Sequence, residues 1–534
     1  MQVSEASLTE LFQHRCAQYA LAPAFDSFGY QLTYHAWEQG ATAIAAFLQR
    51  DCHVKKGDRI ALILPNILAY PLVLMGAFLA GLVVVNINPL YTAPEMEHTL
   101  QDSGAKVAVI LKNFTGVLES IRSKTAVEKV LVANLGDGIT GFKRYLVNFV
   151  GWLKRKTPVI DAPDYLDLAI VLKNKKSRRP VSCEGTDIAF LQYTGGTTGK
   201  MKAAVLTHHN VIANINQCLT WLAPPLRAGA EVVVMPLPLY HIFSLTSTLF
   251  MVALGAKSIL IANPRDLSSL IKAIRTARFS VFIGVNTLFR GLLDHPAFKQ
   301  VDFSQLHLTF SGGMTLQLDI ATEWGKTTGV PIIEGYGLTE ASPVVTINAP
   351  EPTAEHRGIG FPVPWTEISI RDEQGEAVSR GMVGELWIRG PQVMREYWQQ
   401  PAETLQVLTH DNWLKTGDLV SEDERGCLHL VDRKKDVIIV SGFNVYPGEV
   451  EAVLTLHPAV QEAGVVGVPC EETGEAVKAF VVLRSPVMAQ ALITFCHRHL
   501  TGYKVPHQIE FVAALPKSNV GKILRKELRH MMAS

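Results

Sequence analysis

The longest uncharged stretch of the chain, residues 60–94, restricts its fold more than any other feature. Within it, residues 67–85 are almost wholly apolar and would be long enough to cross a lipid bilayer. However, a proline and two glycines interrupt the apolar run, and polar turn residues bracket it. We therefore predict a buried helix over residues 67–79 and a buried strand over residues 82–87 rather than a membrane span.

Helical and strand-like patterns alternate over most of the chain. Residues 8–19 and 36–48 have helical patterns, whereas residues 59–64 and 107–111 are short apolar runs typical of strands. This alternation predicts an α/β protein in which helices cover β-sheets. Because the chain has 534 residues, it should contain two or more folding units.

A loop rich in glycine, threonine and lysine follows the apolar run of residues 188–191. Backbone N–H groups at glycines, threonine hydroxyls and a lysine charge together suit the triphosphate of a nucleotide. The loop is not a Walker A motif, because Thr194 stands where the first glycine is required and Met201 where serine or threonine is required. A flexible turn between two strands is the alternative. The candidate phosphate ligands are Thr194, Gly195, Gly196, Thr197, Thr198, Gly199 and Lys202.

Further motifs follow this loop in a distinctive order. They are residues 334–340 (EGYGLTE), 413–418 (WLKTGD), 432–436 (DRKKD), 441–447 (SGFNVYP) and 516–522 (PKSNVGK). In that order and at those spacings they resemble the core motifs of the acyl-adenylate-forming ligases, and among these the bacterial long-chain fatty acid–CoA ligases. The resemblance covers nearly the whole chain.

The resemblance implies a nucleotide site built from side chains of three motifs. Tyr336 would stack on adenine, Thr339 would bind the α-phosphate, and Glu340 would hold Mg²⁺. Asp418 would bind the ribose hydroxyls of ATP, and Arg433 would bind ribose or phosphate. Without the surrounding motif, the last two would be interpreted as a turn carboxylate and a solvated surface charge.

An acyl site is implied next to the nucleotide. By resemblance, His241 forms the wall or gate of the acyl site, although a lone histidine after a turn is more often structural. Gly312 and Gly313 follow an apolar strand-like run, and ligands of open α/β sheets bind at such strand ends. The resemblance places both glycines beside the adenine and the acyl tail, with a simple tight turn as the alternative.

The implied catalytic residues are Lys522, Thr339, Glu340 and Lys202. Lys522 would approach the carboxylate and the α-phosphate, where its positive charge offsets the charge of the transition state. The basic segment behind it, including Lys526 and Arg529, is expected to be a solvated face.

The resemblance further implies two domains that move relative to each other. Residues 1–434 would form a large adenylate-forming domain, an α/β lobe of several subdomains with βα-layered sheets and a small β-rich part. Residues 435–534 would form a smaller α+β lid that rotates about Lys435. After the rotation, Gly442 and Phe443 would line the channel for the pantetheine of coenzyme A.

Together these assignments imply a ligase that uses ATP and Mg²⁺ to join a long-chain fatty acid to coenzyme A through acyl-AMP. One alternative is a fatty acyl-AMP ligase that loads a carrier protein, which the Gly442–Phe443 loop and the complete hinge oppose. The other is a non-catalytic fatty-acid binding or uptake protein, which the retained Lys522, Glu340 and Thr339 oppose. Three positions depart from the family pattern: Ala203 and Asn412 replace glycines, and Lys415 replaces a histidine. Ala203 would strain the loop if that glycine has a positive φ.

Composition limits the partners of the chain. The 50 Lys and Arg residues nearly balance the 49 Asp and Glu residues, so we expect no nucleic acid partner. The 7 cysteines are scattered, which argues against a disulfide framework and a zinc site and indicates a reducing cytoplasm. The N-terminus has no basic, apolar leader pattern, and we expect no secretory signal. The sequence leaves open whether the protein forms a homodimer.

Residues 142–156 mix aromatic and aliphatic side chains with basic residues and contain no acidic residue. Such a segment can lie in a membrane interface, where lysines and arginines meet anionic headgroups. It could equally be a surface helix that packs on its own domain. The first interpretation would place a cytoplasmic protein peripherally on the inner face of the inner membrane.

Overall fold

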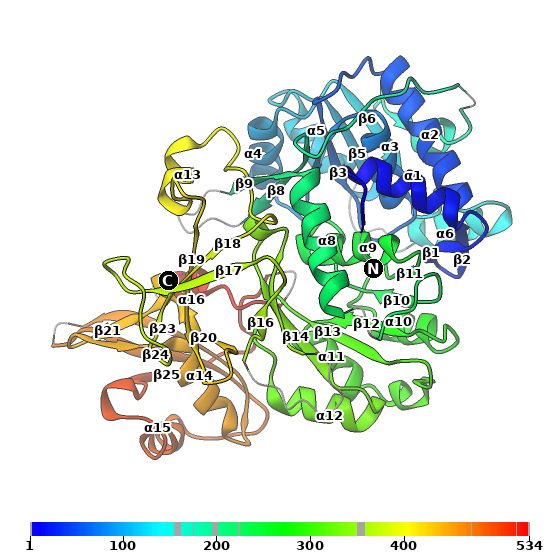
Figure 1. Ribbon diagram of the computed structural model, residues 1–534. Coiled ribbons are helices and arrows are strands. Elements are labelled where there is room, and N and C mark those ends of the chain that lie inside the picture. Colours follow the sequence, from blue (N-terminus) through cyan, green and yellow to red (C-terminus); the bar gives the residue numbers. More distant parts are fainter. Residues whose placement is uncertain are drawn as a thin grey trace.

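The computed structural model describes residues 3–153, 162–174, 176–194, 201–222, 225–349, 358–470, 472–518 and 521–531. A large lobe, blue to yellow, is followed by a smaller C-terminal lobe, orange to red (Figure 1). Within the described residues, the strands form four β-sheets. This mixed α/β architecture with a smaller, β-rich C-terminal lobe confirms the predicted fold class.

The first sheet of the large lobe has seven strands in the order β7-β6-β5-β3-β4-β8-β9. Its neighbouring strands are parallel, except that β8 and β9 run antiparallel and flank the predicted phosphate loop. The strands are β3 (Arg59–Ile63), β4 (Val83–Asn86), β5 (Val107–Leu111), β6 (Lys129–Ala133), β7 (Leu166–Asp167), β8 (Ile188–Thr194) and β9 (Lys202–Thr207).

The second sheet has nine strands in the order β16-β15-β14-β13-β12-β10-β11-β1-β2. Strands from β14 to β1 in this order are parallel, and antiparallel strands complete both edges. They are β1 (Pro23–Ser27), β2 (Tyr30–Thr33), β10 (Val232–Met235), β11 (Lys257–Leu260), β12 (Val281–Gly284), β13 (Leu308–Ser311), β14 (Ile332–Gly337), β15 (Val344–Ile347) and β16 (Phe361–Pro362).

One apolar core connects these two sheets through a group of helices. Every residue of α3 is buried, and β4 is buried throughout, which confirms the predicted buried helix and strand. Among the described residues, no helix is both long and apolar enough to span a membrane. The connecting helices are α1 (Leu8–Gln18), α2 (Tyr34–Arg50), α3 (Ala69–Leu79), α8 (His208–Leu222) and α9 (Ile242–Ala253).

The remaining helices of the large lobe lie outside this central group. Helices α4 and α5 pack on the seven-stranded sheet in a separate apolar cluster. Helices α10, α11 and α12 lie along the nine-stranded sheet (Figure 1). Their bounds are α4 (Ala93–Ser103), α5 (Thr115–Arg122), α6 (Phe142–Leu153), α7 (Leu168–Val171), α10 (Leu267–Ile274), α11 (Asn286–Asp294) and α12 (Leu318–Thr328).

A small antiparallel sheet connects the two lobes. Its strands are β17 (Glu367–Arg371), β18 (Gly384–Arg389), β19 (Leu414–Glu422) and β20 (Leu428–Arg433), and α13 (Pro401–Val407) lies between β18 and β19 in the chain. After β20, the single turn η4 (Lys434–Asp436) leads into the C-terminal lobe. The predicted hinge, Lys435, lies in this turn between two sheets, and the domain boundary placed there stays a prediction.

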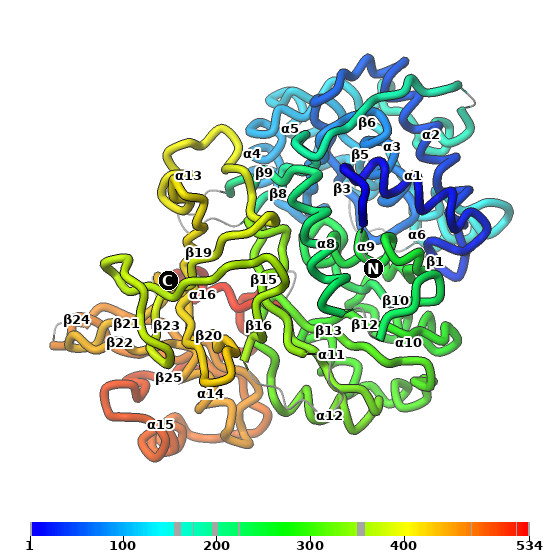
Figure 2. The backbone as a smooth tube through the Cα atoms, in the orientation of Figure 1, coloured from blue at the N-terminus to red at the C-terminus, as the bar shows by residue number. Residues whose placement is uncertain are grey.

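The C-terminal lobe has its own five-stranded sheet and apolar core. Its elements are β21 (Ile438–Val440), β22 (Phe443–Val445), α14 (Pro447–Leu456), β23 (Val460–Cys470), β24 (Gly474–Leu483), α15 (Ala489–His497), β25 (Gln508–Phe511) and α16 (Arg525–His530). Figure 2 shows the red end of the chain returning toward the large lobe. There Gly521 has a φ of +83°, and a Cβ at this position would lie 2.9 Å from Oγ1 of Thr287, so glycine is required for this approach.

Candidate active site

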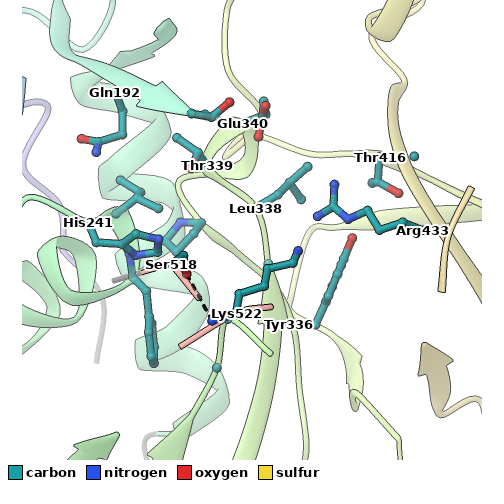
Figure 3. Close-up of a pocket in the computed structure, with 18 of the residues that line it drawn as sticks. Gln192, His241, Tyr336, Leu338, Thr339, Glu340, Thr416, Arg433, Ser518 and Lys522 are labelled. Carbon is teal, nitrogen blue, oxygen red and sulfur yellow. Dashed lines mark hydrogen bonds between the residues drawn. The ribbon is translucent and has the colours of Figure 1, made fainter. Parts of the chain in front are cut away.

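A cavity of about 1520 Å³ lies where the large lobe, the small connecting sheet and the C-terminal lobe meet. Pockets for one small ligand usually measure roughly 300–1,000 Å³, so this cavity has room for more than one substrate. Figure 3 shows its lining residues, which come from widely separated parts of the chain. An apolar part of the wall lies between α8, α9 and β15 and includes Cys218, Leu222, Phe250, Met251 and Ile347.

Tyr336, Asp418 and Arg433, three predicted nucleotide ligands, form one hydrogen-bonded cluster. The Tyr336 hydroxyl donates to Oδ2 of Asp418 at 2.5 Å, and Nε of Arg433 lies 2.7 Å from Oδ1. Asp418 is only 2% exposed. Burial raises the pKa of Tyr336 well above its usual value, and Asp418 raises it further, so the phenol stays protonated. Burial acts to lower the pKa of Arg433, but Asp418 and Tyr336 outweigh it and the pKa is raised.

Lys522 reaches the same cavity from the C-terminal lobe. Two hydrogen bonds join Lys522 to Ser518: the Ser518 N–H donates to the Lys522 carbonyl at 2.8 Å, and the Ser518 hydroxyl accepts the Lys522 N–H at 3.2 Å. Figure 3 shows the side chain extending into the pocket between His241 and Tyr336. The amine is open to the cavity, yet the surrounding walls desolvate it. This burial lowers the pKa of Lys522 to about 8, with Arg433 adding to the decrease and Asp418 opposing it.

His241 lies at the N-terminus of α9 and lines the cavity. Its Nδ1 accepts the N–H of Phe243 at 3.4 Å, and burial lowers the pKa of the ring to about 4. The ring is therefore neutral near pH 7, with its proton on Nε2. Gly312 lies close by: a Cβ there would lie 3.2 Å from Cζ of Phe243 and 3.3 Å from the Gly335 carbonyl oxygen. Gly313 has a φ of +83° beside open space.

The predicted phosphate loop connects β8 to β9. Thr194 and Lys202 are paired across the two strands, while Gly195, Gly196, Thr197, Thr198 and Gly199 lie outside the described residues. Lys202 is buried and forms an ion pair with Glu403 on α13. Ala203 continues β9 in regular antiparallel pairing and does not have a positive φ, so the expected strain at this position is absent.

Thr339 and Glu340 follow β14 in the short turn η3 (Thr339–Ala341) and line the cavity. Oε1 of Glu340 accepts a hydrogen bond from the Tyr397 hydroxyl at 2.7 Å. No hydrogen bond from the described part of the chain reaches its other oxygen, Oε2. A carboxylate oxygen of this kind is a ligand that Mg²⁺ prefers, so the donor chemistry fits the implied metal.

Three residues singled out in the sequence, Gly442, Phe443 and Asn412, do not line the cavity. Phe443 is 56% exposed, and its ring stacks on Tyr503 with the centroids 4.8 Å apart. Neither Gly442 nor Phe443 is among the described residues that line the cavity. Asn412, which replaces a glycine of the family pattern, has a φ of 64°, a conformation that asparagine tolerates better than most residues.

The basic helix α16 differs partly from expectation. Lys526 is exposed, as predicted. The prediction for Arg529 is wrong, because its guanidinium lies 3.0 Å from Oδ1 of Asp436. A second arginine of the same helix, Arg525, pairs with Asp432 at 3.0 Å and with Glu451 at 2.8 Å. These acidic partners are distant in sequence, so the helix pattern alone could not reveal them.

Sequence reasoning missed three further residues around the cavity. Tyr397 and Glu403 contact Glu340 and Lys202, as described above. Gln192 is 4% exposed, and its side-chain amide donates to the Tyr240 carbonyl at 2.7 Å, which fixes the loop before His241. No local motif indicates these contacts.

Comparisons with known proteins agree with this geometry. The chain matches the family described as AMP-binding enzyme over residues 12–398, and the AMP-binding enzyme C-terminal domain over residues 449–522. It is 49% identical to a long-chain-fatty-acid–CoA ligase of Salmonella typhimurium, covering 98% of this chain and 94% of that protein. The crystal structure of the anthranilate CoA ligase AuaEII in complex with anthranoyl-AMP matches with a TM-score of 0.87 and 25% identity, over 99% of this chain and 97% of the other. ATP-bound MatB from Rhodopseudomonas palustris matches with a TM-score of 0.84 and 25% identity, over 98% of both chains.

Proposed function

Because this chain belongs to the AMP-binding enzyme family, we infer that it is an ATP-dependent ligase that joins a long-chain fatty acid to coenzyme A. The first half-reaction forms acyl-AMP and releases pyrophosphate, and the second transfers the acyl group to the thiol of coenzyme A and releases AMP. The observation that supports this most directly is the entry of Lys522 into a cavity shared with the Tyr336–Asp418–Arg433 cluster and His241.

Each part of the cavity has a role in this proposal. The Tyr336–Asp418–Arg433 cluster binds the adenosine of ATP, and Lys522 brings a positive charge to the reacting carboxylate and α-phosphate. The neutral His241 can donate its Nε2 proton to an oxygen of the fatty carboxylate. The apolar wall between α8 and α9 takes the acyl chain. Glu340 is the residue that would hold Mg²⁺, which supplies charge neutralisation for the phosphates when bound.

One assay separates this function from its alternatives. Exchange of labelled pyrophosphate into ATP is expected with oleate and Mg²⁺, and coenzyme A should convert the product to a thioester. A carrier-loading ligase would exchange pyrophosphate but form no thioester with coenzyme A. A binding protein without catalysis would show neither reaction, and that result would contradict the proposal.

The pH dependence of adenylation should report the amine of Lys522. Its ammonium is present below the pKa of about 8 and is lost as the pH rises through that value. We expect kcat/KM for ATP, which reports the free enzyme, to fall on the alkaline side of about pH 8. In Lys522→Arg, whose side chain stays charged, this alkaline decrease should disappear from the residual activity. An unchanged profile in Lys522→Arg would contradict the assignment.

We also propose that α6 contacts a membrane containing anionic lipid. No residue of α6 is buried, and its aromatic and aliphatic side chains are unusually exposed. Phe149 and Trp152 are each 56% exposed and stack with their ring centroids 5.9 Å apart. Figure 1 shows α6 at the edge of the large lobe away from the C-terminal lobe, so membrane contact would leave the lobe interface free. The basic residues that follow α6 in the sequence complement anionic headgroups.

Co-sedimentation with anionic vesicles tests this contact. The double substitution Phe149→Ser and Trp152→Ser should weaken binding about tenfold or more, since burial of one large apolar side chain is worth roughly 1.5–3 kcal/mol. Leu405→Ser is the matched control, because Leu405 is 77% exposed on α13, elsewhere on the surface. Arg144 is unsuitable for charge reversal because it pairs with the buried Asp137 at 3.2 Å. Unaltered vesicle binding by the double variant would refute the contact.

A further inference from the structure

Residues 394–398 form an additional strand-like edge beside β9. The Val205 N–H donates to the Glu396 carbonyl at 2.9 Å, and the Trp398 N–H donates to the Ala203 carbonyl at 2.8 Å. At one end of this segment, the Met394 N–H donates to the backbone carbonyl of Glu340 at 2.7 Å. The segment therefore connects β9, which follows the loop, directly to the turn that carries Glu340.

Tyr397 of this segment also contacts the side chain of Glu340. Its hydroxyl donates to Oε1 at 2.7 Å, and the residue is 7% exposed. Backbone and side chain of Glu340 are thus both held by the same short segment, and Oε1 is occupied while Oε2 is left for a ligand.

Lys202 and Thr404 hold Tyr397 in place. Nζ of Lys202 lies 5.4 Å from the ring centroid, within the range of a cation–π interaction, and is paired with Glu403. The Tyr397 N–H donates to Oγ1 of Thr404 at 3.0 Å, which ties the segment to α13. The buried Lys202 therefore contacts both Glu403 and the ring of Tyr397, and these contacts hold the ring in place.

We propose that Tyr397 is a positioning residue that orients the carboxylate of Glu340 so that Oε2 binds the Mg²⁺ of Mg-ATP. This inference rests on the proposed ligase function and adds to it a residue that acts through Glu340. Partners that orient a metal-binding carboxylate typically contribute 10- to 100-fold to metal affinity or activity, so we expect an effect of about tenfold or more.

Tyr397→Phe tests the proposal because it keeps the ring and removes only the hydroxyl. The affinity for ATP is measured by isothermal titration calorimetry, once with Mg²⁺ and once with EDTA, in the absence of fatty acid. In the unaltered enzyme Mg²⁺ should increase the affinity. In Tyr397→Phe this increase should shrink about tenfold, whereas the affinity in EDTA stays unchanged. A Mg²⁺-dependent increase within twofold of that of the unaltered enzyme would overturn the proposal.

Two comparisons exclude a merely structural effect. Tyr165→Phe loses an equivalent bond, from the Tyr165 hydroxyl to Oε2 of Glu119 at 2.6 Å, far from the cavity and should keep the full Mg²⁺ effect. In the double variant Tyr397→Phe, Glu340→Gln, the loss should not exceed that of Glu340→Gln alone, because Tyr397 acts through Glu340. If the losses of the two single variants added up in the double variant, the action of Tyr397 through Glu340 would be contradicted. Failure of the ligase function itself would appear separately, as absent pyrophosphate exchange in the unaltered enzyme.

Discussion

Lys522→Ala should lose the formation of acyl-AMP but keep thioester formation from supplied acyl-AMP. The desolvated ammonium of Lys522 lies in the cavity, where its positive charge can offset the charge that develops when the carboxylate attacks the α-phosphate. Removing one such stabilising group typically costs roughly 10²–10³-fold in rate, and we expect a decrease of that size in pyrophosphate exchange.

The comparison of the two half-reactions is what makes this test specific. Lys272→Ala is the matched control, because Lys272 is exposed on α10 and does not line the cavity. It should leave pyrophosphate exchange close to that of the unaltered enzyme. If Lys522→Ala slowed both half-reactions equally, the assignment of Lys522 to the first step would be wrong.

Lys435→Pro should preserve acyl-AMP formation and slow thioester formation. Proline restricts φ to about −65°, which suits the turn η4 but limits other conformations at this position. The lid could then occupy the position described here but could not rotate about Lys435. Misplaced reacting groups can cost roughly 10²-fold, and we expect a decrease of about this size in thioester formation from acyl-AMP.

Single-turnover measurements of each half-reaction would check the result. Lys435→Ala is the matched control, since it removes the same side chain and leaves the backbone free to rotate. Unchanged overall turnover in Lys435→Pro would defeat the proposed hinge.

The sequence predicted those helices, strands and motifs that can be recognised within one short segment of the chain. The uncharged run became α3 and β4, and the strand predicted over residues 107–111 is β5. The motif residues Tyr336, Arg433 and Lys522 line one cavity, and the buried Asp418 bonds to the first two, although their roles as ligands stay predictions. Such residues could be found because glycines, hydroxyls and charges cluster in short segments whose order resembles a known family.

Contacts between distant segments could not be predicted in this way. Tyr397 and Glu340 are 57 residues apart, and Lys202 and Glu403 are 201 residues apart. Each is an ordinary residue in its own segment, and only the folded chain brings it to its partner. The same reason explains the wrong expectation for Arg529, whose partner Asp436 lies at the far end of the C-terminal lobe's sequence.

The C-terminal lobe carries both Lys522 and Phe443. Phe443 lies on β22 of the five-stranded sheet, and Ile523, next to Lys522, packs in an apolar cluster with Phe480 of β24. Lys522 occupies the cavity while Phe443 stays on the outer surface. With the proposed rotation, the movement that brings Phe443 into the cavity therefore removes Lys522 from it. The structure of the C-terminal lobe then sets the order of the two half-reactions. A new round of acyl-AMP formation cannot start until the thiol of coenzyme A has left the cavity.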